Sequence, residues 1–170
     1  MMIKKISFIT ILLILFTGYS CKKIYEQGES VVINELMPVN STTVTDNYGE
    51  YDDWIELYNL SSSPQDLSGC YLSDKKSKRT KWQFPSGTSV PGNGYLIIWA
   101  DNDTTQDGLH ASFKLSSQGE KVVFSYPDST IIDEVAYPAH NSELSYSRNP
   151  NGIGSFRWQA PTFNKSNDNK

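Results

Sequence analysis

The sequence has few basic residues, few histidines and few cysteines, and these shortages argue against several classes of function. Its 170 residues carry 15 Lys and Arg against 19 Asp and Glu, for a net charge of −4. Because phosphate binding draws on a basic surface, this balance argues against nucleic acid as a partner. Neither His110 nor His140 belongs to an H-x-x-x-H metal motif, and there is no G-x-S-x-G elbow or glycine-rich phosphate loop. We therefore predict that the protein is not an enzyme, and no catalytic residue is assigned.

Long apolar runs are also missing, apart from the stretch Ile6–Phe16 near the N-terminus. That stretch is too short for a membrane-spanning helix, which needs about 20 residues. Lys4 and Lys5 precede it and small residues follow it before Cys21, which is the pattern of a secretory signal. Removal of residues 1–20 would leave 150 residues (170 − 20), enough for one domain. The remaining chain has 13 basic residues (15 − 2) and 19 acidic ones, a net charge of −6.

The end of this signal resembles a bacterial lipobox, in which the cysteine is lipidated and becomes the mature N-terminus. The matching residues are Thr17-Gly-Tyr-Ser-Cys21. The resemblance implies a lipoprotein signal peptide over residues 1–20, lipidation of Cys21, a lipidated tether over residues 21–30, and a location at the cell envelope, anchored to the outer membrane. Lipid chains would hold the domain there, since each buried methylene contributes about 0.8 kcal/mol. Ordinary secretion with cleavage near Ser20, and a disulfide between Cys21 and Cys70, remain as alternatives.

The rest of the chain shows an apolar period of two, which indicates short strands separated by turns rich in Pro, Gly and Asn. Seven or more strands at this spacing predict an all-β sandwich. Tyr95–Ala100 is apolar on both faces and predicts a central, fully covered strand. The other predicted strands are Val31–Met37, Trp54–Asn59, Lys81–Phe84, Lys121–Tyr126 and Thr130–Tyr137.

The alternation also predicts which side chains form the core. The predicted core residues are Trp82, Phe84, Leu96, Ile98, Val122, Phe124 and Ile132. Cys70 stands between apolar neighbours with no basic residue beside it, so we expect a buried structural thiol.

Several blocks of this chain follow one another in a recognisable order. They are Val32-Ile-Asn-Glu-Leu36, Trp54-Ile-Glu-Leu-Tyr-Asn59, Asp66-Leu-Ser-Gly-Cys-Tyr-Leu-Ser-Asp74, Trp82-Gln-Phe-Pro-Ser-Gly87, Pro91-Gly-Asn-Gly-Tyr-Leu96, Phe113-Lys-Leu-Ser-Ser-Gln-Gly-Glu120, Ile132-Asp-Glu-Val-Ala-Tyr137 and Ser147-Arg-Asn-Pro-Asn-Gly152. Together they resemble the lamin tail domain family in its bacterial form.

The resemblance implies an immunoglobulin-like β-sandwich without an inter-sheet disulfide, over residues 31–164, followed by a polar tail over residues 165–170. Animal members of this family are protein-interaction tails of nuclear filaments, and bacterial members occur in exported proteins. This chain has no coiled-coil rod, so filament assembly is not expected.

Polar residues within the predicted strands have a structural and a chemical interpretation. Carboxylates on neighbouring strands can share a metal or perform acid–base chemistry. For a binding-type sandwich we instead expect these side chains to cap strand ends, bond turn backbones or face solvent, with Arg148 as an ion-pair partner of one of them. The residues concerned are Asn34, Glu35, Glu56 and Asn59.

Two acidic loops, residues 46–53 and 101–107, are the best candidates for a ligand site. Calcium favours several oxygen ligands from flexible loops, although the second loop does not follow the EF-hand pattern. Tyr48 and Tyr51 can stack on a sugar or anchor a protein partner, as aromatic residues do at interfaces. The predicted ligand-binding residues are Tyr48, Tyr51, Asp101, Asp103 and Asp107. No residue is assigned as a metal ligand and no cofactor is expected, with calcium as the one open alternative.

The sequence therefore predicts a non-catalytic interaction module at the cell envelope that recognises a protein or a glycan. The alternative is a calcium-stabilised structural domain with no ligand recognition of its own.

Overall fold

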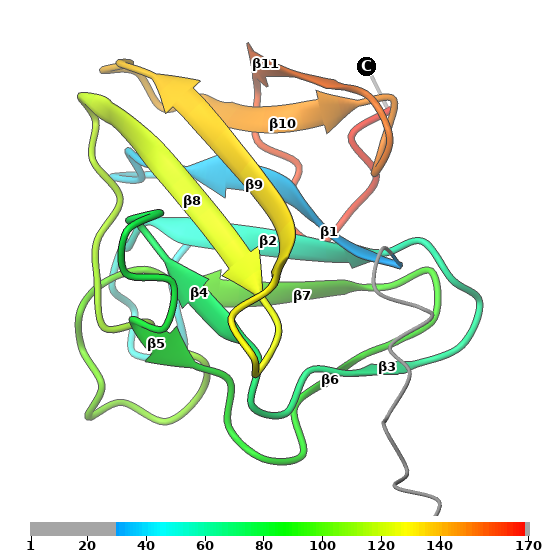
Figure 1. Cartoon of the computed structure of the whole chain (residues 1–170). Coiled ribbons are helices and arrows are strands. Elements are labelled where there is room, and N and C mark those ends of the chain that lie inside the picture. Colours follow the sequence, from blue (N-terminus) through cyan, green and yellow to red (C-terminus); the bar gives the residue numbers. More distant parts are fainter. Residues whose placement is uncertain (1–29, 169–170) are drawn as a thin grey trace, which may run out of the picture.

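The computed structural model describes residues 30–168, and this part of the chain is all-β (Figure 1). It contains eleven strands and no helix, so within residues 30–168 no segment has the helical length and hydropathy to cross a membrane. The predicted signal peptide and Cys21 lie outside the described residues. The strands are β1 (Val31–Met37), β2 (Trp54–Asn59), β3 (Gln65–Asp66), β4 (Tyr71–Ser73), β5 (Trp82–Gln83), β6 (Ser89–Val90), β7 (Tyr95–Trp99), β8 (Gly119–Ser125), β9 (Ile131–Pro138), β10 (Ser145–Asn149) and β11 (Ser155–Gln159).

Two antiparallel sheets form the layers of the sandwich. One has five strands in the order β11-β10-β1-β2-β7, and the other has four in the order β5-β4-β8-β9. Figure 1 shows β8 and β9 lying across β1, β2 and β7, with the short β3–β6 ribbon at one end. This arrangement confirms the predicted all-β, immunoglobulin-like β-sandwich.

The core between the sheets contains the residues that the alternation predicted. Phe84, Ile98, Val122 and Phe124 are fully buried, while Trp82, Leu96 and Ile132 are partly buried against the same cluster. The Phe84 ring meets that of Phe124 edge to face, with centroids 5.9 Å apart. Cys70 lies in this core at 5% exposure, which confirms its prediction as a buried residue.

A β-bulge in β1 interrupts the alternation of its side chains and places Glu35 on the same face of the sheet as Glu56 of β2. Ile33 pairs with Leu57 and Glu35 pairs with Glu56, so Asn34 is the extra residue. Such a bulge leaves one residue outside the ladder and bends the strand. Since Ile33 and Leu57 belong to the core, Glu35 and Glu56 project from the opposite, outer face of the five-stranded sheet.

The outer face of this sheet is covered by the C-terminal segment, residues 160–168, which we call the C-terminal clasp. Phe163 packs edge to face on Trp54, with ring centroids 5.2 Å apart, and also contacts Trp99. Asn167 is fully buried and donates a hydrogen bond to the Asn34 carbonyl at 3.2 Å. The predicted polar tail over residues 165–170 therefore needs correction, because the packed domain continues to residue 168.

The prediction that Tyr95–Ala100 is a central strand is wrong, because β7 is an edge strand of the five-stranded sheet. Its free edge is partly covered by residues 109–111. The Trp99 N–H donates to the Leu109 carbonyl at 2.9 Å, and the Ala111 N–H donates to the Trp99 carbonyl at 2.7 Å. An apolar pattern on both faces indicates that both faces of the strand are covered. It does not indicate that a hydrogen-bonded strand lies along each of its edges.

Arg148 joins the two sheets, but not through the partner that we predicted. Its guanidinium lies 2.9 Å from the carboxylate of Asp133 on β9, and it does not pair with Glu35 or Glu56. Its Nε donates to the Ile33 carbonyl at 2.8 Å, while Asp133 accepts from the Ile33 N–H at 2.9 Å. β1 pairs with β10 at Glu35 and Leu36. Ile33 lies before that pairing begins, and the ion pair supplies the hydrogen-bond partners of its backbone N–H and carbonyl.

Candidate functional site

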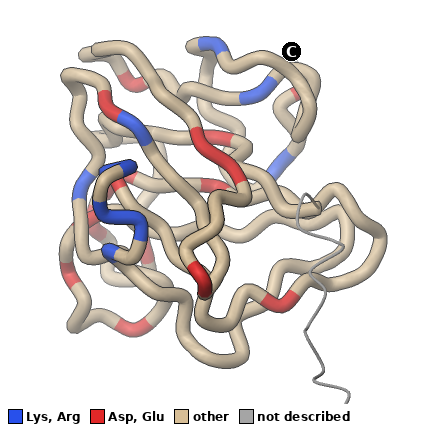
Figure 2. Tube along the Cα trace, in the orientation of Figure 1, with Lys and Arg blue, Asp and Glu red and all other residues tan. Residues whose placement is uncertain are grey.

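The two predicted ligand loops lie against each other although they are far apart in sequence. The Gln106 side-chain amide donates to the Glu50 carboxylate at 2.8 Å. The Asp107 backbone N–H donates to the Tyr48 hydroxyl at 2.9 Å. These contacts join residues 46–52 and 101–107 into one surface, which we call the acidic pole. Figure 2 shows acidic positions along the loop that follows β7, whereas Lys and Arg gather on the connection between β4 and β5.

Both predicted tyrosines present their rings at the acidic pole. Tyr48 is 52% exposed and Tyr51 is 49% exposed, values that set them apart from the buried core aromatics. The Tyr48 ring stands edge-on to His110, with centroids 6.5 Å apart. Because Asp107 also holds its hydroxyl, Tyr48 has a defined direction while part of its ring still faces solvent. Trp54, next to this loop, is fully buried.

The three predicted aspartates of the second loop do not share one environment. Asp107 is exposed and Asp103 is half-buried. Asp101 is only 7% exposed; its carboxylate lies 2.5 Å from Nδ1 of the buried His110 and accepts the Asp103 N–H at 2.9 Å. Asp101 therefore supports the loop from within, and a partner at the surface would meet Asp103 and Asp107. His110 is buried beside Asp101 and packs within this turn.

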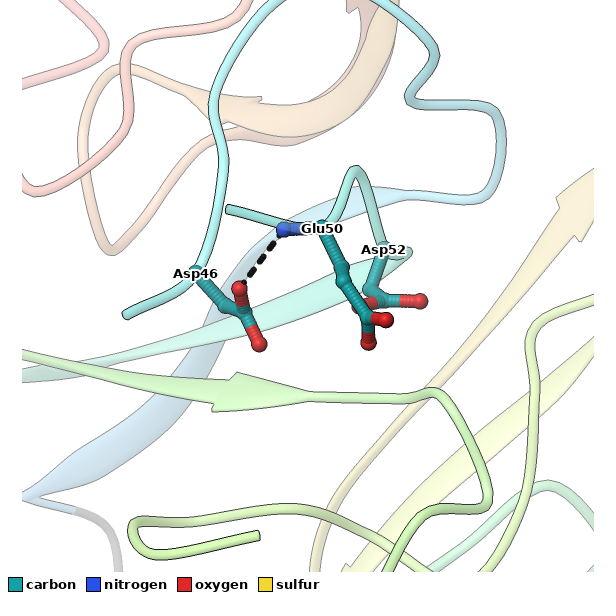
Figure 3. A group of neighbouring side chains, drawn as sticks. All are labelled: Asp46, Glu50 and Asp52. Carbon is teal, nitrogen blue, oxygen red and sulfur yellow. Dashed lines mark hydrogen bonds between the residues drawn. The ribbon is translucent and has the colours of Figure 1, made fainter. Parts of the chain in front are cut away.

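A cluster of three carboxylates lies within the first loop. Asp46, Glu50 and Asp52 each offer an oxygen within 4.8 Å of the other two (Figure 3). Burial, followed by the charges of Asp101, Asp46 and Glu50, raises the pKa of Asp52 above its ordinary value. The sequence showed that this loop is acidic, but we assigned no metal ligand in it. The spacing D-x-x-x-E-x-D was the available indication, because a tight turn brings these three carboxylates together.

A second polar centre lies under the C-terminal clasp, and the sequence interpretation missed it. Glu35 and Glu56 are both fully buried and bond backbone N–H groups of the C-terminal clasp, as one of the predicted roles required, rather than capping strand ends or facing solvent. Glu56 accepts from the Asn34 side chain at 2.9 Å and from the Asn164 N–H at 2.7 Å. Glu35 accepts the Thr162 N–H at 2.9 Å. These bonds attach the clasp to the sheet, so the two carboxylates have a structural role.

Burial raises the pKa of Glu56 to about 8, and the neighbouring Glu35 adds to the rise. The folded state therefore holds a proton that the unfolded chain releases above its ordinary pKa of 4.5. This contribution to stability is complete below that value and is lost as the pH rises through the folded pKa. From Glu56 alone, we expect the free energy of unfolding to fall between pH 5 and pH 8, by at most about 1.4 kcal/mol per pH unit. Urea unfolding at pH 5, 6, 7 and 8 measures this slope.

A Glu56→Gln variant should have a flatter pH dependence over the same range, because its side chain cannot ionise. Some slope should remain, since burial also raises the pKa of Asp53 to about 7. The control is Glu143→Gln: hydrogen bonds from Thr42 and Thr43 lower the pKa of this exposed carboxylate, so it titrates below the tested range. Equal slopes for Glu56→Gln and the unaltered protein would contradict the assignment.

Comparison with known families places most of the domain in one of them. Residues 26–139 match the profile of the Lamin Tail Domain family, and this match spans more than half of the chain. It includes β1 to β9 and both loops of the acidic pole, and it ends before β10, β11 and the C-terminal clasp. No curated protein matches the sequence.

Proposed function

The chain belongs to the lamin tail domain family, and we propose that this non-catalytic immunoglobulin-like domain is an interaction module held at the cell envelope. We infer that it binds a protein or a glycan partner through the acidic pole. The observation that carries the proposal is the pair of half-exposed tyrosines, at 52% and 49%, beside carboxylates on two joined loops.

The chemistry of these groups suits recognition. A tyrosine ring offers an apolar face to a sugar or to a protein pocket, while its hydroxyl stays in a polar environment. Asp103 and Asp107 can accept hydrogen bonds from sugar hydroxyls or from basic side chains of a partner. The bond from Asp107 to Tyr48 and the bond from Gln106 to Glu50 hold the loops in place before binding. Such preorganisation reduces the entropy lost when a partner docks.

Replacing Tyr48 and Tyr51 with alanine should weaken partner binding without moving the melting temperature by more than about 2 °C, because the rings are half exposed. Loss of two interface anchors costs roughly 2 kcal/mol or more, which is at least about 30-fold in Kd. The measurement is retention of the immobilised protein's partners from a detergent-solubilised envelope extract, followed by titration of each retained component.

The matched control is Ile153→Ala, which truncates a side chain that is 72% exposed in the turn between β10 and β11. It should bind as the unaltered protein does. If the tyrosine variant also binds normally, the acidic pole is not the recognition surface. The alternative would then gain support, namely a calcium-stabilised structural domain without recognition of its own.

The envelope location is a separate part of the proposal and rests on the lipobox resemblance of residues 17–21. Cys21→Ser should move the protein from the membrane fraction to the soluble fraction, because the lipidated thiol is lost. Its melting temperature should not change, since the first strand of the sandwich, β1, begins at Val31. Fractionation and mass analysis of the N-terminal peptide test this. An unaltered protein that is wholly soluble and carries no lipid would refute the anchor.

A further inference from the structure

Three buried oxygen acceptors at the acidic pole have no hydrogen-bond donor among the described residues. They are Asp46 Oδ2, Asp52 Oδ2 and Gln106 Oε1. Unsatisfied buried acceptors are costly, and most buried polar atoms in proteins have a partner. Here they occur together with the carboxylates of Asp46, Glu50 and Asp52. We propose that these three carboxylates form a divalent-cation site, and that calcium is the ion that fits it.

Asp46 is the central residue of this site. The residue is only 8% exposed, and its Oδ1 accepts the N–H groups of Tyr48 and Glu50 at 2.8 and 2.9 Å. These two bonds fix the carboxylate and leave Oδ2 without a donor. Figure 3 shows this oxygen on the same side of the loop as the carboxylates of Glu50 and Asp52. A cation there would supply the missing partner.

The type of ligand favours calcium. The three ligand oxygens lie within 4.8 Å of one another, close enough to share one ion. Calcium, at roughly 2.3–2.6 Å from its ligands, accepts several carboxylate oxygens in a flexible arrangement, whereas magnesium, at roughly 2.0–2.1 Å, demands a near-ideal octahedron and keeps several of its waters. The ligands also come from a turn, and calcium tolerates the irregular geometry that turns provide.

The negative charge at the site also favours a bound divalent cation. Three carboxylates meet here, and Asp101 adds to the negative potential that acts on Asp52. A divalent cation would neutralise this repulsion. It would also connect the two loops more firmly, because Glu50 already accepts a hydrogen bond from Gln106, whose Oε1 is one of the unsatisfied oxygens. The site does not depend on whether the tyrosines recognise a partner.

The test is a calcium titration of the full-length protein in detergent, followed by calorimetry and by thermal unfolding. We expect a single site with a Kd of roughly 10⁻⁴–10⁻³ M, the range of extracellular calcium modules. At about 10 mM CaCl₂ the unfolding constant should then fall roughly 10- to 100-fold relative to EDTA. Equal concentrations of MgCl₂ should have a smaller effect, and NaCl at the same ionic strength should have almost none. A response to NaCl as large as that to calcium would show screening alone and would overturn the proposal.

Asp46→Asn is the decisive variant. The asparagine oxygen can keep the bonds to Tyr48 and Glu50, while its amide group takes the place of Oδ2. It should lose the calcium response and should be more stable than the unaltered protein in EDTA, because it relieves the repulsion. Glu50→Gln provides a second variant if Asp46→Asn does not fold. The control is Asp103→Asn, which removes one charge from the neighbouring loop and should keep the response. A full calcium response in either cluster variant would refute the site.

Discussion

Replacing Phe124 with alanine is expected to lower the free energy of unfolding by about 3–5 kcal/mol, as truncation of a buried aromatic residue does. Phe124 is fully buried in β8, and its ring meets Phe84 at 5.9 Å. Its backbone is paired on both sides, with Leu72 of β4 and with Asp133 of β9, so the position of the ring is fixed. Neighbours held in this way cannot move far enough to fill the space. Urea unfolding at 25 °C measures the loss.

Phe124→Leu is the matched control, because it keeps an apolar side chain and leaves a smaller cavity. It should cost clearly less than the alanine variant. Ile153→Ala, at an exposed position, should change the stability by no more than about 0.5 kcal/mol. A loss below about 1 kcal/mol for Phe124→Ala would mean that this ring is not a central element of the core.

The strands that are apolar on one face could be predicted from the sequence because their periodicity follows directly from burial. β1 and β2 have the predicted bounds, and the predicted core residues are buried or partly buried. β10 was not predicted as a strand, since Ser145–Asn149 alternates small and polar residues and Tyr146 is its only large apolar side chain. Its place depends on pairing with β1 and β11, which is information that lies elsewhere in the chain.

The contacts of the C-terminal clasp could not be predicted for a similar reason. The predicted domain reached residue 164, but residues 165–168 were assigned to a tail, because a polar composition usually indicates a solvated segment. In the fold Asn167 is fully buried, while residues 162 and 164 supply the backbone donors that two buried glutamates need and Phe163 provides the apolar contact. The polar groups of the clasp therefore satisfy the buried carboxylates of Glu35 and Glu56. Neither the clasp nor the two glutamates can be recognised from the sequence as part of this contact when considered alone.

The residues of the candidate site could be predicted from the sequence, but their arrangement in space could not. Loop length and acidic content indicated residues 46–53 and 101–107, but the contact between Glu50 and Gln106 spans 56 positions. The burial of Asp101 beside His110 also follows from tertiary packing, because an acidic residue in a polar loop is normally expected to be exposed.

Asp133→Ala is expected to lower the free energy of unfolding by about 3 kcal/mol, at the lower end of the range for breaking a buried ion pair. The side chains of Arg148 and Asp133 retain 18% and 15% exposure, so the pair is largely shielded from water. The variant leaves the guanidinium without its carboxylate and removes the acceptor of the Ile33 N–H. The loss should therefore exceed that of an ordinary surface charge.

The adjacent residue provides the control for this prediction. Glu134 pairs with Lys76 and with Lys121, both at 3.0 Å, but these lysine side chains are 51% and 36% exposed, so Glu134→Ala should cost no more than about 1 kcal/mol. A double-mutant cycle with Arg148→Met then isolates the coupling between the two partners. Because Asp133 lies on β9 and Arg148 on β10, a large coupling would mean that this pair joins the two sheets energetically. If Asp133→Ala and Glu134→Ala lower the free energy of unfolding equally, the bulge that follows Ile33 is stabilised by the hydrogen bonds between the strands, and the ion pair adds nothing to it.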